Sequence, residues 1–389
     1  MAPVRPLWRH ASRGSLLTTV LMLGIAGAIG CEQPRRMPYV PPDLHNWKDV
    51  RPTVRGLRLH LFTTTGSVEP PAGLFGGSWT TRVALEVPAF VIEHPRAGAI
   101  LVGTGLSPAL RDGPERYLGW LLARVARPSV EEGDELASQL EAAGFAPARI
   151  RRVILPDCRF PQTGGLSGLR EAEVLVGRAD REWGLRGDLG SGVQREDLLA
   201  VQRWQPIDFA AAKPLGTLDR AVDLLGDGSA WLLDVAGYTP GTVAVLVRLP
   251  KGPVVLAGGA VPLASTLRTP VLPPIATDAD GWWEAAWRLK RLRELADVLV
   301  VPGFELAAVD DKPRPDIVVH RVGAAKAGGK GKDDGTGDGT KGGRDKRKDG
   351  GARRSPIDPS VRPRPNPPFP LPDPPATPPP MRPPQPHEN

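Results

Sequence analysis

The carboxyl-terminal 67 residues are too rich in proline, glycine and charge to build a hydrophobic core. From Gly328 to Gly351, 20 of 24 residues are Gly, Lys or Asp, and from Pro356 to Pro386, 16 of 31 are Pro. So few apolar groups cannot offset the entropy lost when a chain is ordered. We therefore predict a disordered tail over residues 323–389. A solvated extension is the simpler interpretation of this tail, and an arm that binds the cell wall or a protein is the alternative.

The basic charge of the chain belongs to its two ends. The formal net charge is +7, but residues 1–30 carry +3 and residues 326–389 carry +5, so residues 31–325 carry −1. Nucleic-acid-binding domains rely on a basic surface, and we expect no nucleic-acid partner for a nearly neutral body. With 41% hydrophobic residues, the chain can still build a sizeable core.

The amino terminus has the order of a secretory signal. Three arginines precede an uncharged run over residues 14–30, which ends at Cys31. Ala28-Ile-Gly-Cys resembles the bacterial lipobox, whose cysteine receives a lipid. We expect a lipoprotein signal peptide over residues 1–30, lipidation of Cys31 and an extracytoplasmic location in the cell envelope, anchored to the membrane. An ordinary cleaved signal is the alternative.

Residues 31–53 show neither helical nor strand periodicity and contain several prolines, which predicts an extended tether. If Cys31 carries a lipid, Cys158 is the remaining thiol of the chain. No intrachain disulfide could then stabilise the fold.

Residues 54–322 alternate short apolar runs with helical patterns, which predicts a layered α/β domain. The apolar runs predict strands over residues 57–65, 81–93 (one or two strands), 99–102, 152–155, 231–235, 243–249, 254–257 and 298–301. The helical patterns cover residues 132–143 and 282–296, and residues 156–168 form a turn-rich segment. One domain of this size can hold two sheets covered by helices.

The order of these elements resembles the metallo-β-lactamase fold, in particular the branch that contains the acyl-homoserine-lactone lactonases. The motifs that carry the resemblance are Phe90-Val-Ile-Glu-His-Pro, Ala99-Ile-Leu-Val-Gly-Thr-Gly-Leu-Ser-Pro, Gly144-Phe, Gly164-Gly-Leu, Glu182-Trp, Gly237-Tyr-Thr-Pro-Gly-Thr, Val255-Leu-Ala-Gly-Gly-Ala and Val300-Val-Pro-Gly-Phe-Glu. The resemblance spans about residues 90–305 and implies an αββα sandwich of two mixed β-sheets flanked by helices. It also implies a hydrolase in which zinc activates a water that attacks a carbonyl.

The residues that hold zinc in that family are replaced in this chain. The corresponding positions are Asp157, Arg159, Pro161, Gln162, Tyr238, Gly259 and Phe304, and Gly103 stands in place of the Asp of an Asp-Thr-Gly loop. Proline offers no side-chain donor, and arginine brings a positive charge to a cation site. Among the seven positions, Asp157 alone keeps a carboxylate. The resemblance therefore predicts that the two-zinc centre cannot form, and we expect neither zinc nor another cofactor.

The histidines of the body do not form zinc-binding pairs in the sequence. His60, His94 and His320 are far apart, and none belongs to a His-x-His or His-x-x-x-His pair. His94 lies in a Glu-His-Pro turn, His60 in an alternating strand and His320 near the end of the body. We expect each of them to have a structural role.

Asp157, Cys158 and Arg159 form the most reactive cluster of the body. A nearby arginine favours a thiolate, but a nucleophile also needs a base within reach, so a buried, inert Cys158 is the favoured interpretation. We expect Asp157, Tyr238 and Glu305 to converge with Arg159. The favoured arrangement is an ion pair of Arg159 with a carboxylate, in place of the metal cross-link.

Three tryptophans begin the last predicted helix. Of these, Trp283 and Trp287 share a face because they are four residues apart, and Trp282 precedes them. Packing of the helix on a sheet is the favoured role, and lining the mouth of a ligand site is the alternative.

Together these features predict an envelope lipoprotein whose metallo-β-lactamase-like domain is a pseudoenzyme with a binding or scaffold role. The alternative is a divergent hydrolase of lactones, esters or thioesters with a rearranged or absent metal site. A third possibility is an envelope-polymer binder that acts through the tail.

Overall fold

The structure is a computed structural model that describes residues 43–47, 54–63, 65–187, 190–210, 212–306, 309 and 313–321. The predicted signal, Cys31, most of the tether and the predicted tail lie outside the described residues. No helix within these ranges is long and apolar enough to cross a membrane. Part of the predicted tether, residues 43–47, is bound to the body, because His45 pairs with Gly216 and Asn46 Nδ2 donates to Pro214 O at 2.8 Å.

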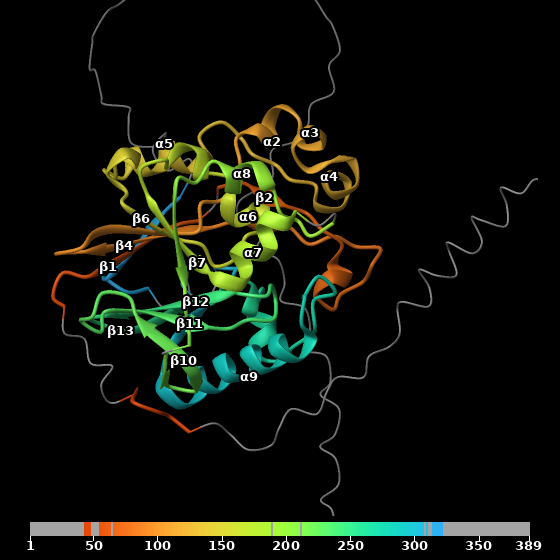
Figure 1. The fold of residues 1–389 in the computed structure, drawn as a ribbon. Helices are drawn as coiled ribbons and strands as arrows, with labels where there is room; N and C mark the ends of the chain where they lie inside the picture. Colours follow the sequence, from red (N-terminus) through yellow and green to blue (C-terminus); the bar gives the residue numbers. More distant parts are fainter. Residues whose placement is uncertain are drawn as a thin grey trace, which may run out of the picture. The chain divides into compact units, whose positions relative to one another are not determined.

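Two mixed β-sheets form the centre of the body (Figure 1). The seven-stranded sheet has the order β15-β1-β4-β5-β6-β7-β8, formed by Ile317–His320, Arg58–Phe62, Ala89–His94, Gly98–Val102, Arg152–Ile154, Glu173–Gly177 and Arg203–Ile207. The six-stranded sheet has the order β14-β13-β12-β11-β10-β9, formed by Leu299–Val301, Gly252–Leu256, Val243–Leu249, Ala230–Asp234, Leu218–Asp223 and Lys213–Leu215. A separate pair, β2 (Ser67–Val68) and β3 (Leu85–Glu86), completes the strands described.

Helices cover the outer faces of both sheets. Helix α9 (Ala279–Ala296) packs on the six-stranded sheet, and α5 (Leu136–Ala142) packs on the seven-stranded sheet. The short helices are α2 (Ala109–Asp112), α3 (Pro114–Leu118), α4 (Trp120–Ala126), α6 (Phe160–Thr163), α7 (Arg178–Arg186) and α8 (Arg195–Leu199). The 3-10 turns are η2 (Ala72–Phe75), η3 (Pro147–Arg149), η4 (Leu166–Gly168), η5 (Gly258–Ala260) and η6 (Ala264–Leu267). This arrangement is the predicted αββα sandwich.

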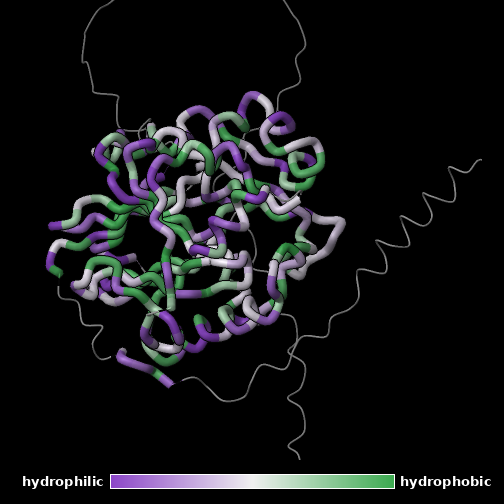
Figure 2. Tube along the Cα trace, in the orientation of Figure 1, coloured by the Kyte–Doolittle hydropathy of each residue, from purple (hydrophilic) through white to green (hydrophobic). Residues whose placement is uncertain are grey.

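The main core lies between the two sheets. All seven residues of β12 are buried, as expected for a central strand covered on both faces. On α9, the buried residues recur at helical spacing: Trp282, Ala285, Ala286, Leu289 and Leu292. Figure 2 shows hydrophobic segments running through the strands and hydrophilic segments mainly at the periphery.

The element boundaries differ from the predictions in several places, of which two have a clear cause. The helix expected from residue 132 begins at Leu136, because Asp134 Oδ2 accepts the Glu131 N–H at 2.8 Å and closes a turn first. The helix expected from Trp282 begins at Ala279, where Asp278 caps it by accepting the Asp280 N–H at 3.1 Å. The turn-rich segment 156–168 contains α6 and η4.

Candidate functional site

The predicted site positions lie on loops that follow the carboxyl ends of strands from both large sheets. Residues 156–165 follow β6, residues 237–242 join β11 to β12, and η5 follows β13. Backbone hydrogen bonds bind these loops together, including Val243 N–H to Pro156 O at 2.9 Å and Gly303 N–H to Val261 O at 2.9 Å. Loops at this edge of a sheet are where α/β proteins commonly place their functional groups.

Arg159 fills the centre of this loop cluster. Its side chain is buried, with Nε donating to Ser191 O at 3.0 Å and Nη2 donating to Ile275 O. The guanidinium carbon lies 4.3 Å from the centre of the Tyr238 ring and 5.6 Å from that of Trp183. A cation between aromatic faces is stabilised by the ring quadrupoles, most strongly where water is excluded. Arg159 thus cross-links four segments of the body through its side chain.

Two buried carboxyl groups lie beside Arg159. Asp157 Oδ1 accepts the Arg159 N–H at 3.0 Å, and Asp180 accepts the Cys158 N–H at 2.7 Å and the Gly241 N–H at 3.3 Å. Burial, followed by the charge of Asp180, raises the pKa of Asp157 to about 7. Burial also raises the pKa of Asp180. These carboxyl groups therefore hold protons more tightly than ordinary ones.

The prediction that Arg159 forms an ion pair with a carboxylate is wrong for the described residues. The hydrogen bonds of its guanidinium go to the backbone carbonyls of two loops, whereas the Asp157 carboxylate bonds the Arg159 backbone. Glu305, which we expected to converge on Arg159, accepts the Ala264 N–H at 2.8 Å instead. The loop carbonyls are hydrogen-bond acceptors that the sequence pattern does not reveal.

Pairs of replaced positions fit each other sterically. A Cβ atom added to Gly259 would lie 1.9 Å from Cδ1 of Tyr238, so the tyrosine ring occupies the space that a side chain at position 259 would need. A Cβ atom added to Gly103 would lie 2.5 Å from Oε1 of Gln162. In each pair, a larger side chain fills the space beside a glycine. The replacements therefore form a packed interior.

The remaining predicted residues lie around this interior. Pro161 is buried in α6, and Phe304 belongs to a separate apolar cluster that includes Phe160. Of the tryptophans, Trp282 reaches the site: it packs with Tyr238, and its Nε1 donates to Gly259 O at 3.2 Å. Trp283 contacts Trp282 edge to face. Trp283 is also partly buried against the Tyr238–Trp282 cluster, and the alternative that the three tryptophans line a ligand mouth stays a prediction.

Cys158 is fully buried, as the favoured interpretation predicted. Burial and the neighbouring carboxyl groups, Asp180 first and then Asp157, raise the pKa of its thiol well above the usual value. The nearby Arg159 therefore does not produce a thiolate. Asp180, which the sequence analysis did not single out, is the group that binds the backbone of this segment.

The three histidines of the body are arranged in two clusters. His94 Nε2 contacts Asp227 at 3.1 Å, and its Nδ1 accepts the Ala97 N–H at 2.9 Å, which is the structural role that we expected. His60 and His320, separated by 260 residues, lie with ring nitrogens 3.0 Å apart. This pairing depends on the parallel contact of β1 with β15, and the sequence pattern gave no sign of it.

The residues of the loop cluster do not fit the zinc centre that the resemblance implies. Zinc needs imidazole, thiolate or carboxylate donors gathered around one point at about 2.0–2.3 Å. Within the described ranges, no three His, Cys, Asp or Glu side chains gather closely enough to hold a metal ion. The centre of the cluster holds the Arg159 guanidinium, whose charge repels a dication.

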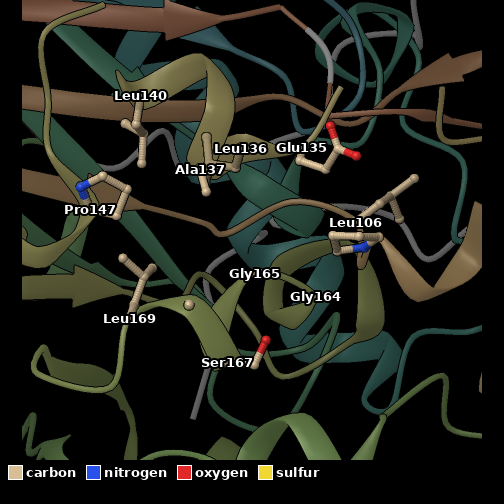
Figure 3. Close-up of a pocket in the computed structure, with 12 residues that line it drawn as sticks. Leu106, Glu135, Leu136, Ala137, Leu140, Pro147, Gly164, Gly165, Ser167 and Leu169 are labelled. Carbon is tan, nitrogen blue, oxygen red and sulfur yellow. The ribbon is translucent and has the colours of Figure 1, made fainter. Parts of the chain in front are cut away.

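A small pocket of about 100 Å³ is lined in part by the Gly164-Gly165 turn (Figure 3). Its walls are mostly apolar and include Leu106, Leu136, Leu140 and Leu169, with Glu135 and Ser167 also lining it. Arg159, Asp157 and Tyr238 do not line this pocket. It therefore meets the loop cluster only through Gly164 and Gly165.

Residues 82–303 match the family described as the Metallo-beta-lactamase superfamily. The chain is 27% identical over 225 residues to the N-acyl homoserine lactonase AttM of Azorhizobium caulinodans and 26% identical to that of Agrobacterium fabrum. Each match covers 57% of this chain and 82% of the relative. A solved N-acyl homoserine lactone hydrolase, with N-hexanoyl-L-homoserine at its catalytic metal centre, has a TM-score of 0.57 at 17% identity and covers 65% of this chain and 95% of that chain.

Proposed function

This chain belongs to the metallo-beta-lactamase superfamily, and we propose that it keeps the fold without the zinc centre and acts by binding rather than by hydrolysis. The observation that carries the proposal is the position of Arg159. Its guanidinium lies between Tyr238 and Trp183 and bonds two loop carbonyls, at the place where the family's loops carry metal ligands. A guanidinium at this position stabilises the fold, but it does not generate hydroxide from a bound water as zinc does.

The other groups of the cluster also favour a binding role. Without a metal, hydrolysis would need a nucleophile activated by a base. The Cys158 thiol is buried with a raised pKa, and both of its neighbouring carboxyl groups are bound to backbone N–H groups. Neither arrangement prepares a nucleophile that a substrate can reach.

The second candidate is a divergent hydrolase of lactones, esters or thioesters. It is favoured by the similarity to the N-acyl homoserine lactonases, which extends over 82% of their length. In such an enzyme Asp157 would be the general base, because its pKa of about 7 lies in the range that suits proton transfer near neutral pH. Its carboxylate would need to become accessible to substrate and water.

Incubation of the purified chain with a panel of lactones and thioesters distinguishes the two candidates. We expect no turnover above buffer and, for any ligand that binds, a rise in melting temperature without product. Turnover that is abolished in Asp157→Asn but retained in Asp208→Asn, an exposed carboxylate, would establish the hydrolase instead. Circular dichroism of both variants checks that the fold is intact.

We further propose that the chain is an envelope lipoprotein anchored through Cys31. The proposal rests on the lipobox-like Ala28-Ile-Gly-Cys sequence. Metabolic labelling with palmitate should mark the wild-type chain and the Cys158→Ser variant but not Cys31→Ser. Retention on isolated cell wall before and after deletion of residues 326–389 tests a partner for the tail, and equal retention would exclude one.

A further inference from the structure

Three side chains from three neighbouring strands form a continuous hydrogen-bonded chain at the β15 edge of the seven-stranded sheet. Glu93 Oε2 of β4 lies 3.0 Å from Nε2 of His60 in β1, and Nδ1 of His60 lies 3.0 Å from Nε2 of His320 in β15. The two imidazoles are nearly parallel, with an angle of 13° between their planes and 5.3 Å between their centres. This geometry directs the two facing ring nitrogens at each other, so one hydrogen atom joins them.

We propose that Glu93, His60 and His320 form a two-proton latch that holds β15 against β1 at neutral pH and releases it in acid. In the neutral state, His60 donates from Nε2 to Glu93 and accepts at Nδ1 from the Nε2–H of His320. One hydrogen atom then lies between Glu93 and His60, and one lies between His60 and His320. This state determines the tautomer of both rings.

The first added proton can be accommodated within the chain. His60 becomes an imidazolium that donates to Glu93 on one side, and it donates to His320 on the other side once His320 moves its own proton to Nδ1. The second proton cannot be accommodated. Two N–H groups would then face each other at 3.0 Å between two positive charges, and Glu93 can neutralise only one of them.

His60 is buried, whereas His320 is half-buried and the Glu93 side chain is 42% exposed. Phe145 packs edge to face against His60 at 4.7 Å, and Phe62 stacks on His320 at 4.6 Å. Glu93 is the carboxylate in contact with His60, Arg58 lies opposite Glu93 on β1, and Arg321 follows β15. Neither arginine can compensate an added positive charge. Burial, followed by the charge of His60, lowers the pKa of His320, which agrees with a second proton that is taken up reluctantly.

Strand β15 is suited to reversible release. It has four residues, it lies at the edge of the sheet and it pairs with β1 alone among the described strands. Just before β15, Asp316 is bound by Arg314 and by the Lys251 N–H. At the other end of β15, His320 itself pairs with Phe62 of β1. The chain continues from β15 directly into residues 322–389. Release would therefore expose the edge of β1.

Hydrogen exchange of the full chain, measured by mass spectrometry and corrected for the intrinsic pH dependence, tests the latch. In the wild type, we expect the protection of peptides covering residues 317–320 to fall at least about tenfold between about pH 7.5 and 5, which corresponds to one unit of pKa difference. Peptides from β12 should keep their protection. Unchanged protection of β15 in the wild type over this range would overturn the proposal.

Variants separate the latch from a general effect of acid. His320→Gln and His60→Gln each remove one titrating ring and keep a side chain that forms hydrogen bonds, so the protection of β15 should no longer depend on pH. His45→Gln, an exposed histidine outside the latch, should respond as the wild type does. If His320→Gln and His60→Gln still lose protection in acid, the latch is wrong. The result is independent of the proposed loss of zinc, because the latch lies outside the loop cluster.

Discussion

Gly259 and Tyr238 share one space in the loop cluster: a Cβ atom on the glycine would lie 1.9 Å from Cδ1 of the tyrosine ring. These positions correspond to the bridging aspartate and a histidine of the family resemblance. The ring fills the volume that the absent side chain leaves, and Trp282 donates to Gly259 O from the other side. Restoring a metal ligand at position 259 therefore also requires the removal of Tyr238.

The steric relation predicts a strong energetic coupling. Gly259→Ala should lower the free energy of unfolding by about 1–3 kcal/mol, because it overpacks a buried site. In a Tyr238→Ala background, the same substitution should cost less, which gives a coupling energy of about 0.5–3 kcal/mol in a double-mutant cycle. Gly168→Ala, where a Cβ atom meets nothing within 4 Å, is the matched control. Additive effects in urea unfolding would show that the two residues do not compete for space.

Arg159 should contribute to stability as an internal cross-link. Arg159→Ala should lower the free energy of unfolding by about 2–4 kcal/mol, because it removes donors from two loop carbonyls and a cation from two aromatic faces. Arg159→Lys should recover little, since an ammonium lacks the planar fork of donors. Arg203→Ala, whose ion pair with Glu171 is exposed, should change stability by less than about 1 kcal/mol. Equal losses of stability in Arg159→Ala and Arg203→Ala would show that Arg159 is not a stabilising cross-link.

Asp157 should make the protein less stable as the pH rises. Its pKa in the folded state is about 7, above its usual value, so between about pH 4 and 7 the folded state binds more protons than the unfolded state. Stability attributable to Asp157 therefore falls as the pH rises through this window, by a few kcal/mol at about 1.4 kcal/mol per pKa unit. Asp157→Asn should be more stable than the wild type at about pH 8 and nearly equal to it at about pH 4. A variant that is less stable at pH 8 would show that the ionised carboxylate is needed. The raised pKa of Asp180 also lowers stability as the pH rises, in the wild type and in Asp157→Asn alike.

Cys158 should be unreactive in the native protein. Its side chain is fully buried and its pKa is raised, so little thiolate is present or accessible at neutral pH. In the Cys31→Ser chain, a thiol reagent such as iodoacetamide should label Cys158 in urea but not under native conditions. Fast native labelling would indicate that the loop after β6 opens to solvent.

Much of the fold could be predicted from local patterns, whereas the contacts within the site could not. Apolar runs predicted β12 and most other long strands because a strand buried on both faces has few polar residues. The stripe of Trp282, Ala285, Ala286 and Leu289 follows the 3.6-residue period and could have shown that Trp282 lies on the buried face of α9. The pairing of His60 with His320, by contrast, depends on the register of strands about 260 residues apart.

The loop cluster shows the same limit. The family resemblance indicated which positions differ from metal ligands, but the sequence carried no sign that Tyr238 fills the space beside Gly259 or that Gln162 fills the space beside Gly103. Asp180 was missed because its role comes from the approach of α7 to two loops, where it accepts the Cys158 and Gly241 N–H groups. Such contacts are properties of the tertiary structure and have no local pattern.

The metal content of the purified full chain tests the central claim most directly. Elemental analysis after growth with added zinc, followed by dialysis without chelator, should find far less than one zinc per chain, and Asp157→Asn should have the same content as the wild type. A content of about one or two zinc ions per chain that survives dialysis and is lost in Asp157→Asn would contradict the account, because it would mean that the loop cluster rearranges into a metal site.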